Sequence, residues 1–141
     1  MDPDQGPVDR LIALVSEGVS LSKRVLGNER QSARLGGRLS ALKTPLWQLQ
    51  ARVKTQAERP PDFIYTLSEE VSSSVDFMQE LTDPDWWNQI CRKDDAAVFR
   101  DLNERLTAAV RGDRQFEAAL NFPRAADEDR ADRIVDFEHL Q

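Results

Sequence analysis

The stretch "VFRDLNERLTAAV", residues 98–110, decides the fold class of this 141-residue chain. Its apolar side chains recur at steps of three and four residues, which gathers them on one side of an α-helix. Either Asp94 or Asp95 is expected to cap this helix at its N-terminus. The stretch therefore predicts an amphipathic helix, whose apolar stripe comprises Phe99, Leu102, Leu106, Ala109 and Val110.

The same periodicity continues through the rest of the chain, and strand patterns are nearly absent. The first helix is expected over residues 7–26, with Gly27 as its stop signal. Five leucines and then Val53 follow one another at steps of three and four over residues 35–53, which predicts a second helix. Pro45 lies inside it and predicts a bend near Leu42, because proline removes one helical hydrogen bond.

A third helix is expected to follow Asp62, its N-cap, and to continue to Leu81. Trp86 and Trp87 come next in a short amphipathic piece, and at least one of them is expected in the core. The fourth helix, which contains the opening stretch, either continues through Gly112 or restarts after it.

Amphipathic helices joined by short polar breaks predict an all-α fold, an antiparallel four-helix bundle over residues 1–122. Residues 123–141 are charged, with an apolar cluster near the end. They are expected to form a brace or linker helix that docks on the core or leads into a further domain. The residues expected in the bundle core are Leu39, Leu42, Leu46, Leu67, Val71, Phe99, Leu102 and Leu106.

The chain carries little that supports catalysis. The single histidine, His139, has no nucleophile beside it, and one histidine with one cysteine does not make a usual zinc site. Gly36 and Gly37 lack the flanking residues of a phosphate-binding loop. We therefore expect no enzyme, with no catalytic residue, no metal and no cofactor.

The cellular compartment is indicated by what the sequence lacks. Cys91 has no second cysteine with which to form an internal disulfide, which favours a reducing compartment. There is no run of about 18 apolar residues, and the N-terminal "MDPDQGPVDR" lacks the apolar core of a secretory signal. We expect a cytoplasmic location.

The net charge of −6 is unevenly distributed. Residues 23–59 contain nine basic and two acidic side chains, whereas residues 60–141 contain nineteen acidic and nine basic ones. Arg30, Arg34 and Arg38 follow at steps of four and therefore share one face of the second helix.

Two interpretations of this arginine stripe remain open. Together with Lys43, the stripe is suited to anionic lipid headgroups, to which each cation near the surface contributes about 1 kcal/mol. Alternatively, the arginines pair with acidic residues of the third and fourth helices, namely Glu69, Asp76, Glu80, Asp101 and Glu104. No nucleic acid is expected, because the basic face lacks aromatic residues.

The first helix is the most apolar segment of the chain. Its residues Leu11, Ile12, Leu14 and Val15 are candidates for insertion into a bilayer after release from the bundle. In the resting protein they are expected to be ordinary core residues.

Residues 75–110 also carry a family resemblance. Phe77 closes the third helix, Trp86 or Trp87 opens the connector, and a Phe-x-x-Leu-Asn-x-Arg-Leu pattern follows from Phe99 to Leu106. This run resembles the second half of the N-terminal four-helix bundles of mixed lineage kinase domain-like proteins. Those bundles are similar in turn to fungal HeLo domains and to the Rx-type coiled-coil domains of plant NLR immune receptors.

The resemblance implies a cell-death or immune signalling domain joined to a downstream kinase, pseudokinase or nucleotide-binding domain. Such domains self-associate on activation, reach the plasma membrane from the cytoplasm and permeabilise it. The expected partners are therefore other copies of the chain and an anionic phospholipid membrane. The alternative is a non-membrane helical adaptor that binds partner proteins.

Overall fold

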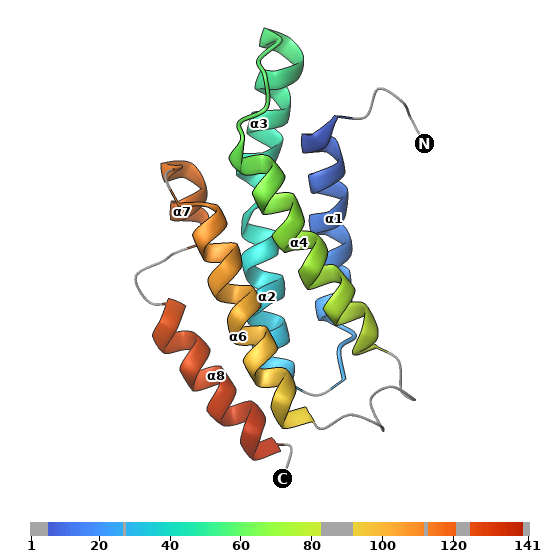
Figure 1. Ribbon diagram of the computed structural model, residues 1–141, viewed down its shortest axis with the longest axis vertical. Helices are drawn as coiled ribbons and strands as arrows, with labels where there is room; N and C mark the ends of the chain where they lie inside the picture. Colours follow the sequence, from blue (N-terminus) through green and yellow to red (C-terminus); the bar gives the residue numbers. More distant parts are fainter. Residues whose placement is uncertain (1–5, 27, 83–91, 112, 121–124, 140–141) are drawn as a thin grey trace.

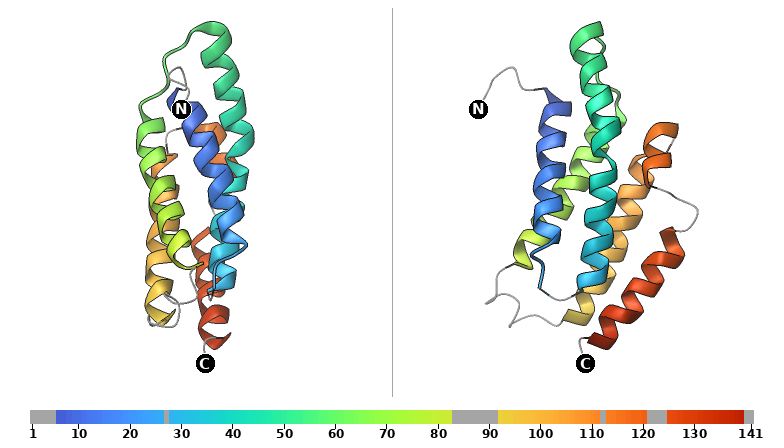
Figure 2. Two further views of the ribbon diagram at one scale, coloured as in Figure 1. Left: turned by 90° about the vertical axis from the view of Figure 1, so that its right-hand side faces the viewer. Right: turned by 180° about the vertical axis from the view of Figure 1, so that it is seen from behind.

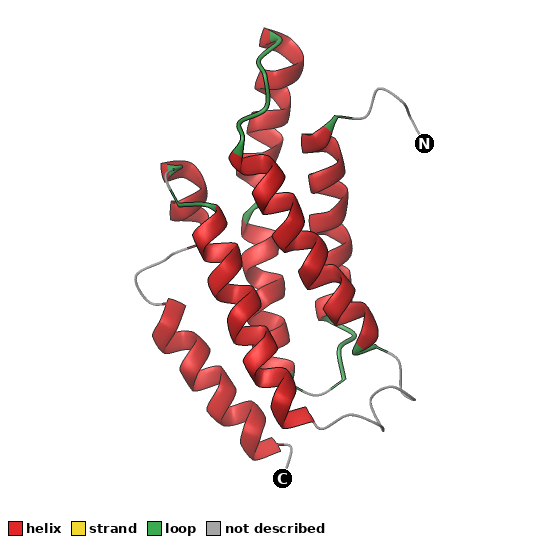
Figure 3. Cartoon of the chain, viewed as in Figure 1, coloured by secondary structure: helices red, strands yellow, loops and turns green. Residues whose placement is uncertain are grey.

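The computed structural model describes residues 6–26, 28–82, 92–111, 113–120 and 125–139. Over these residues the secondary structure is helical, with turns and short loops between the helices and no strand (Figure 3). The helices lie side by side along the long axis of the molecule (Figure 1). The all-α class expected from the sequence is confirmed.

Helix α1 (Pro7–Ser22) begins where the sequence predicts, with proline in its first turn, but ends four residues early. The carbonyl of Ser22 accepts a hydrogen bond of 2.8 Å from the Ser32 hydroxyl. The backbone N–H of Leu26 donates to the carbonyl of Leu81, 3.1 Å away. The last turn expected for α1 is therefore replaced by a loop that is tied to two other helices.

Helices α2 (Glu29–Ala41) and α3 (Lys43–Gln56) correspond to the bent second helix. The break falls at Leu42, as expected, because Pro45 has no N–H to donate to the carbonyl of Ala41. The two helices follow one another in nearly the same direction (Figure 2). Helix α3 ends at Gln56, and the following residue, Ala57, caps it in a left-handed backbone conformation with φ of 52°.

Helix α4 (Phe63–Glu80) follows Asp62 as expected, although the Asp62 side chain makes no capping hydrogen bond. Helix α6 (Arg92–Ala109) begins two residues before Asp94. Asp94 and Asp95 therefore lie within its first turn, and the expectation that one of them is the N-cap is wrong. The tryptophans at 86 and 87 lie outside the described residues.

The fourth helix restarts rather than continues. Asp113 Oδ1 accepts hydrogen bonds from the backbone N–H groups of Gln115 at 3.0 Å and Phe116 at 3.2 Å. This carboxylate caps the short helix α7 (Arg114–Leu120). Helix α8 (Ala125–His139) then occupies the segment expected to form a brace.

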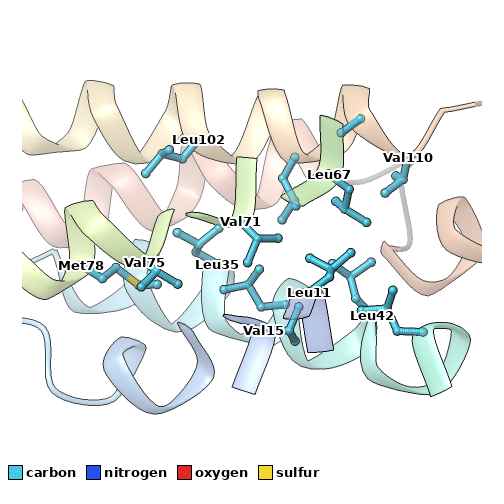
Figure 4. Close-up of a cluster of buried hydrophobic side chains, with 14 of the residues drawn as sticks. Leu11, Val15, Leu35, Leu42, Leu67, Val71, Val75, Met78, Leu102 and Val110 are labelled. Atoms are coloured by element: carbon cyan, nitrogen blue, oxygen red, sulfur yellow. The ribbon is translucent and has the colours of Figure 1, made fainter. Parts of the chain in front are cut away.

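The core lies between α1, α2, α4 and α6, where leucine, valine and methionine side chains meet (Figure 4). The eight residues that the periodicity assigns to the core are all buried. Phe99 also stacks edge-on against Phe77, with ring centroids 5.1 Å apart. No helix among the described residues is long and apolar enough to cross a membrane.

Candidate functional site: the arginine face of α2 and its cover

The three arginines of the stripe on α2 differ in their surroundings. Arg30 is exposed, the side chain of Arg34 is 38% exposed, and Arg38 is buried with 5% of its surface exposed. Exposure thus falls along the stripe toward the middle of the bundle. Helix α2 packs against α8 and α6 as well as against α1, so the stripe is partly covered by other helices.

Arg38 is held inside the bundle by Asn103 of α6. The guanidinium Nη1 donates to Asn103 Oδ1. Asn103 is itself buried, and its Nδ2 donates to the carbonyl of Phe99 at 2.9 Å. A buried cation requires hydrogen-bonding partners, because otherwise the loss of its hydration is not compensated. In this conformation Arg38 is therefore part of the α2–α6 interface and does not face an outside ligand.

Arg34 is held by Asp132 of α8. Its Nε donates to Asp132 Oδ2 over 2.9 Å, and the aspartate is 5% exposed. Because the acid is nearly buried and the arginine only partly exposed, water screens this pair less than it screens an ordinary surface ion pair.

Asp136, one helical turn further along α8, caps the N-terminus of α2. Its Oδ1 accepts a hydrogen bond from the backbone N–H of Arg30 at 2.8 Å, and its Oδ2 accepts one from the N–H of Gln31 at 2.9 Å. Helix α2 has no side-chain cap of its own, since Asn28 adopts a left-handed conformation with φ of 50°. A carboxylate satisfies these N–H groups and is favoured by the positive end of the helix dipole.

Helix α8 therefore places acidic residues toward α2 while two of its apolar residues face outward. Ile134 is 53% exposed and Phe137 is 45% exposed, so neither docks on the core. The surface of α2 that α8 covers carries Arg34 and two N–H groups that have no acceptor within α2, which explains why aspartates lie against it. Figure 2 shows α8 beside the lower part of α2 in the view from behind.

Pairing of the stripe with acids of the third and fourth helices was one of the two interpretations of the sequence, but the acid that pairs with Arg34 lies on α8. Asp132 of α8 pairs with the Arg34 side chain, whereas Asp136 accepts hydrogen bonds from backbone N–H groups at the start of α2. The sequence did contain a signal, since these two acids are spaced by four residues, as are Arg30 and Arg34. Glu70 of α4 instead lies 2.7 Å from Arg105 Nε.

The remaining candidate residues lie on α1 and α3. Leu11 and Val15 are fully buried, and Ile12 and Leu14 are partly buried against the same core. Insertion of α1 into a bilayer would thus require the bundle to open. Lys43 is partly exposed at the start of α3.

Asp9 of α1 links that helix to α3. Its carboxylate accepts a hydrogen bond from the Gln50 side chain and lies 3.5 Å from Lys54 Nζ. The Gln50 hydrogen bond is the main cause of a lowered pKa of Asp9, the positive charge of Lys54 adds to it, and partial desolvation opposes it. No cluster of three or more metal-ligating side chains occurs within the described part of the chain.

Comparison of the chain with protein-family models, with curated proteins and with solved structures finds no match.

Proposed function

We propose that this chain is a cell-death or immune signalling domain that binds anionic membranes when α8 leaves α2. In this account α1, the bent pair α2–α3, α4, and α6 with α7 form an antiparallel four-helix bundle, with α8 as its brace. The supporting observation is that α8 covers the arginine face of α2 through an ion pair and a helix cap.

The contacts of Asp132 and Asp136 of α8 with α2 form the cover of the arginine face. This cover is suited to reversible release. Separation of α8 from α2 returns Arg34, Asp132 and Asp136 to water, where each can be hydrated. It thereby frees Arg34 beside the already exposed Arg30, and each cation near an anionic surface contributes about 1 kcal/mol. Because charged contacts weaken with ionic strength, both the cover and the membrane contact are expected to respond to salt.

The later steps of the proposal rest on the sequence resemblance. The released domain moves from the cytoplasm to the plasma membrane, self-associates, and permeabilises the bilayer with help from the apolar residues of α1. A downstream kinase, pseudokinase or nucleotide-binding domain supplies the activating signal. Arg38 contributes only if α2 also separates from α6, since it is buried against Asn103.

Co-sedimentation with vesicles tests the proposal. Asp132→Asn combined with Asp136→Asn weakens the cover, and we expect stronger binding and dye release with anionic vesicles than the wild type gives. Asp76→Asn combined with Glu138→Gln is the matched control, because it removes two exposed negative charges elsewhere. Equal binding by the two double variants would show that net charge, and not the cover, controls binding.

A protein partner is the second candidate, and the outward face of α8 favours it. Ile134 and Phe137 are one turn apart on the helix, and both are about half exposed. Exposed apolar pairs of this kind are suited to a partner helix or groove. The adaptor function would be preferred if the cover variants stayed monomeric and bound no vesicles.

A further inference from the structure

Helix α3 has a composition unlike that of the other helices. Its 14 residues include Lys43, Arg52 and Lys54 and no acidic side chain. It also carries Trp47, whose surface is 54% exposed. The patterns that identified the core and the arginine stripe did not include this tryptophan, and the contacts of α8 with α2 do not involve it.

The cations and the tryptophan share one face of α3. Lys43, Trp47, Ala51 and Lys54 follow at steps of four, four and three residues, which aligns them along the helix. The Lys54 side chain is 62% exposed, and its Nζ lies 3.5 Å from Asp9 of α1 at the edge of this face. The buried residues of α3 lie on its other side, toward the bundle, and are Pro45, Leu46 and Leu49.

The position of α3 makes this face accessible. At one end of the molecule α3 projects beyond α1 and α4 in all three views (Figures 1 and 2). Helix α8 lies toward the opposite end, beside α2 and α6. Trp47 is 54% exposed in this arrangement, so its face is accessible while α8 remains in place.

Tryptophan favours the boundary between water and lipid, because its large ring is apolar while its indole N–H still finds hydrogen-bond partners there. Neighbouring lysines add attraction to anionic headgroups and extend along the surface with their apolar stems. The exposed aromatic residues of α3 and α4 differ in the charges near them. Tyr65 of α4 is equally exposed, but it lies one turn from the exposed Glu69, which such headgroups would repel.

We propose that the outer face of α3, defined here as Lys43, Trp47, Ala51 and Lys54, docks on the headgroup layer of an anionic bilayer. Helix α8 does not cover this face, and the contact acts on the same membrane together with the arginine face that α8 frees. The inference deepens the proposed membrane function. It shares only Lys43 with the lipid-binding residues expected from the sequence, and Trp47 lies outside the arginine stripe, so the inference can fail separately.

The test uses the full chain with vesicles of phosphatidylserine and phosphatidylcholine, and with vesicles of phosphatidylcholine alone. We expect Trp47→Ala to weaken binding to the anionic vesicles on the order of tenfold, from the loss of an aromatic side chain at the interface. Lys43→Gln combined with Lys54→Gln should weaken it by about 30-fold, since each cation contributes about 1 kcal/mol. Tyr65→Ala is the matched control and should bind as the wild type does.

Two further measurements distinguish the loss of a membrane contact at Trp47 from a change in the fold. Trp47→Phe retains an aromatic ring and should restore most of the binding, provided that circular dichroism shows the same helix content for all variants. Lipids with brominated acyl chains should quench part of the wild-type tryptophan fluorescence, and that part should be missing in Trp47→Phe.

Three outcomes would overturn the inference. The first is equal binding by Trp47→Ala and the wild type. The second is a Trp47-dependent change in oligomer size without lipid, which would assign the face to a second copy of the chain. The third is Trp47-dependent binding of soluble inositol hexakisphosphate as tight as binding to vesicles. None of these outcomes bears on the cover variants at Asp132 and Asp136, which test the release of α8.

Discussion

Asp136 accepts a hydrogen bond from the backbone N–H of Arg30, 106 residues earlier in the chain, over 2.8 Å. The last described helix thus supplies the cap that α2 lacks. Asp132 forms an ion pair with Arg34 one turn along the same two helices. The arginine face and its acidic cover are consequently held together at two points, both of which involve charge.

The first prediction concerns the cap. Asp136→Ala removes the acceptor for two N–H groups at the start of α2, and we expect it to lower the free energy of unfolding by about 1 kcal/mol, up to about 2. Urea unfolding followed by circular dichroism measures the change. Glu138→Ala, at an exposed acid two residues along α8, should change stability by less than half as much; an equal loss would assign the effect to the helix in general.

The second prediction compares two adjacent glycines of α2. A Cβ at Gly36 would lie 2.6 Å from Ser22 Cβ, whereas one at Gly37 would have no atom within 4 Å. Gly36→Ala should therefore destabilise the protein by about 1–3 kcal/mol, because α1 and α2 must separate. Gly37→Ala should stabilise it by up to about 1 kcal/mol, since alanine is the better helix former. Thermal unfolding of both variants measures the two changes. Equal midpoints would contradict the close approach of Gly36 to Ser22.

The third prediction concerns pH. Because the pKa of Asp9 is lowered in the folded protein, its contribution to stability is present above the ordinary aspartate pKa of about 3.9 and is lost as pH falls below it. Asp9→Asn should cost less than about 1 kcal/mol near neutral pH, since the Lys54 partner is exposed. This loss of stability in Asp9→Asn should disappear at acidic pH, where Asp9 of the wild type is protonated. A urea-unfolding series over pH, in which a constant difference from the wild type persists below pH of about 3, would refute it.

The fourth prediction concerns the buried pair of Arg38 and Asn103. Asn103→Ala removes an acceptor from a buried guanidinium, so we expect a loss of about 1–3 kcal/mol. In an Arg38→Met background the same change should cost less, because the cation is gone. A double-mutant cycle by chemical denaturation measures this coupling, and strictly additive losses would show that the two side chains act independently.

The sequence predicted the features that depend on local pattern. The 3.6-residue periodicity of apolar side chains located the helices and the eight core residues, and Pro45 located the break at Leu42. Helix ends were less predictable, because they depend on distant partners. Helix α1 ends early where Ser32 bonds the carbonyl of Ser22.

The orientation of α8 was the main feature that the sequence did not predict. Apolar residues near the end of a chain usually dock on the core, yet Ile134 and Phe137 face outward. The hydrophobic pattern alone does not reveal these contacts of α8, which join residues about 100 positions apart in the sequence. Asp132 binds Arg34, and Asp136 binds the N-terminus of α2. Trp47 was also missed, because a single apolar residue on a polar helix face does not stand out from the periodicity.

We propose that α8 leaves α2 when the protein binds an anionic membrane. Hydrogen exchange at the backbone amides of Arg30 and Gln31 tests it most directly, because Asp136 accepts both of these hydrogen bonds. We expect these amides to be protected in solution and to exchange on phosphatidylserine vesicles at the rate seen in Asp136→Ala, while core amides of α4 remain protected. Unchanged protection at Arg30 and Gln31 in the vesicle-bound protein would contradict it.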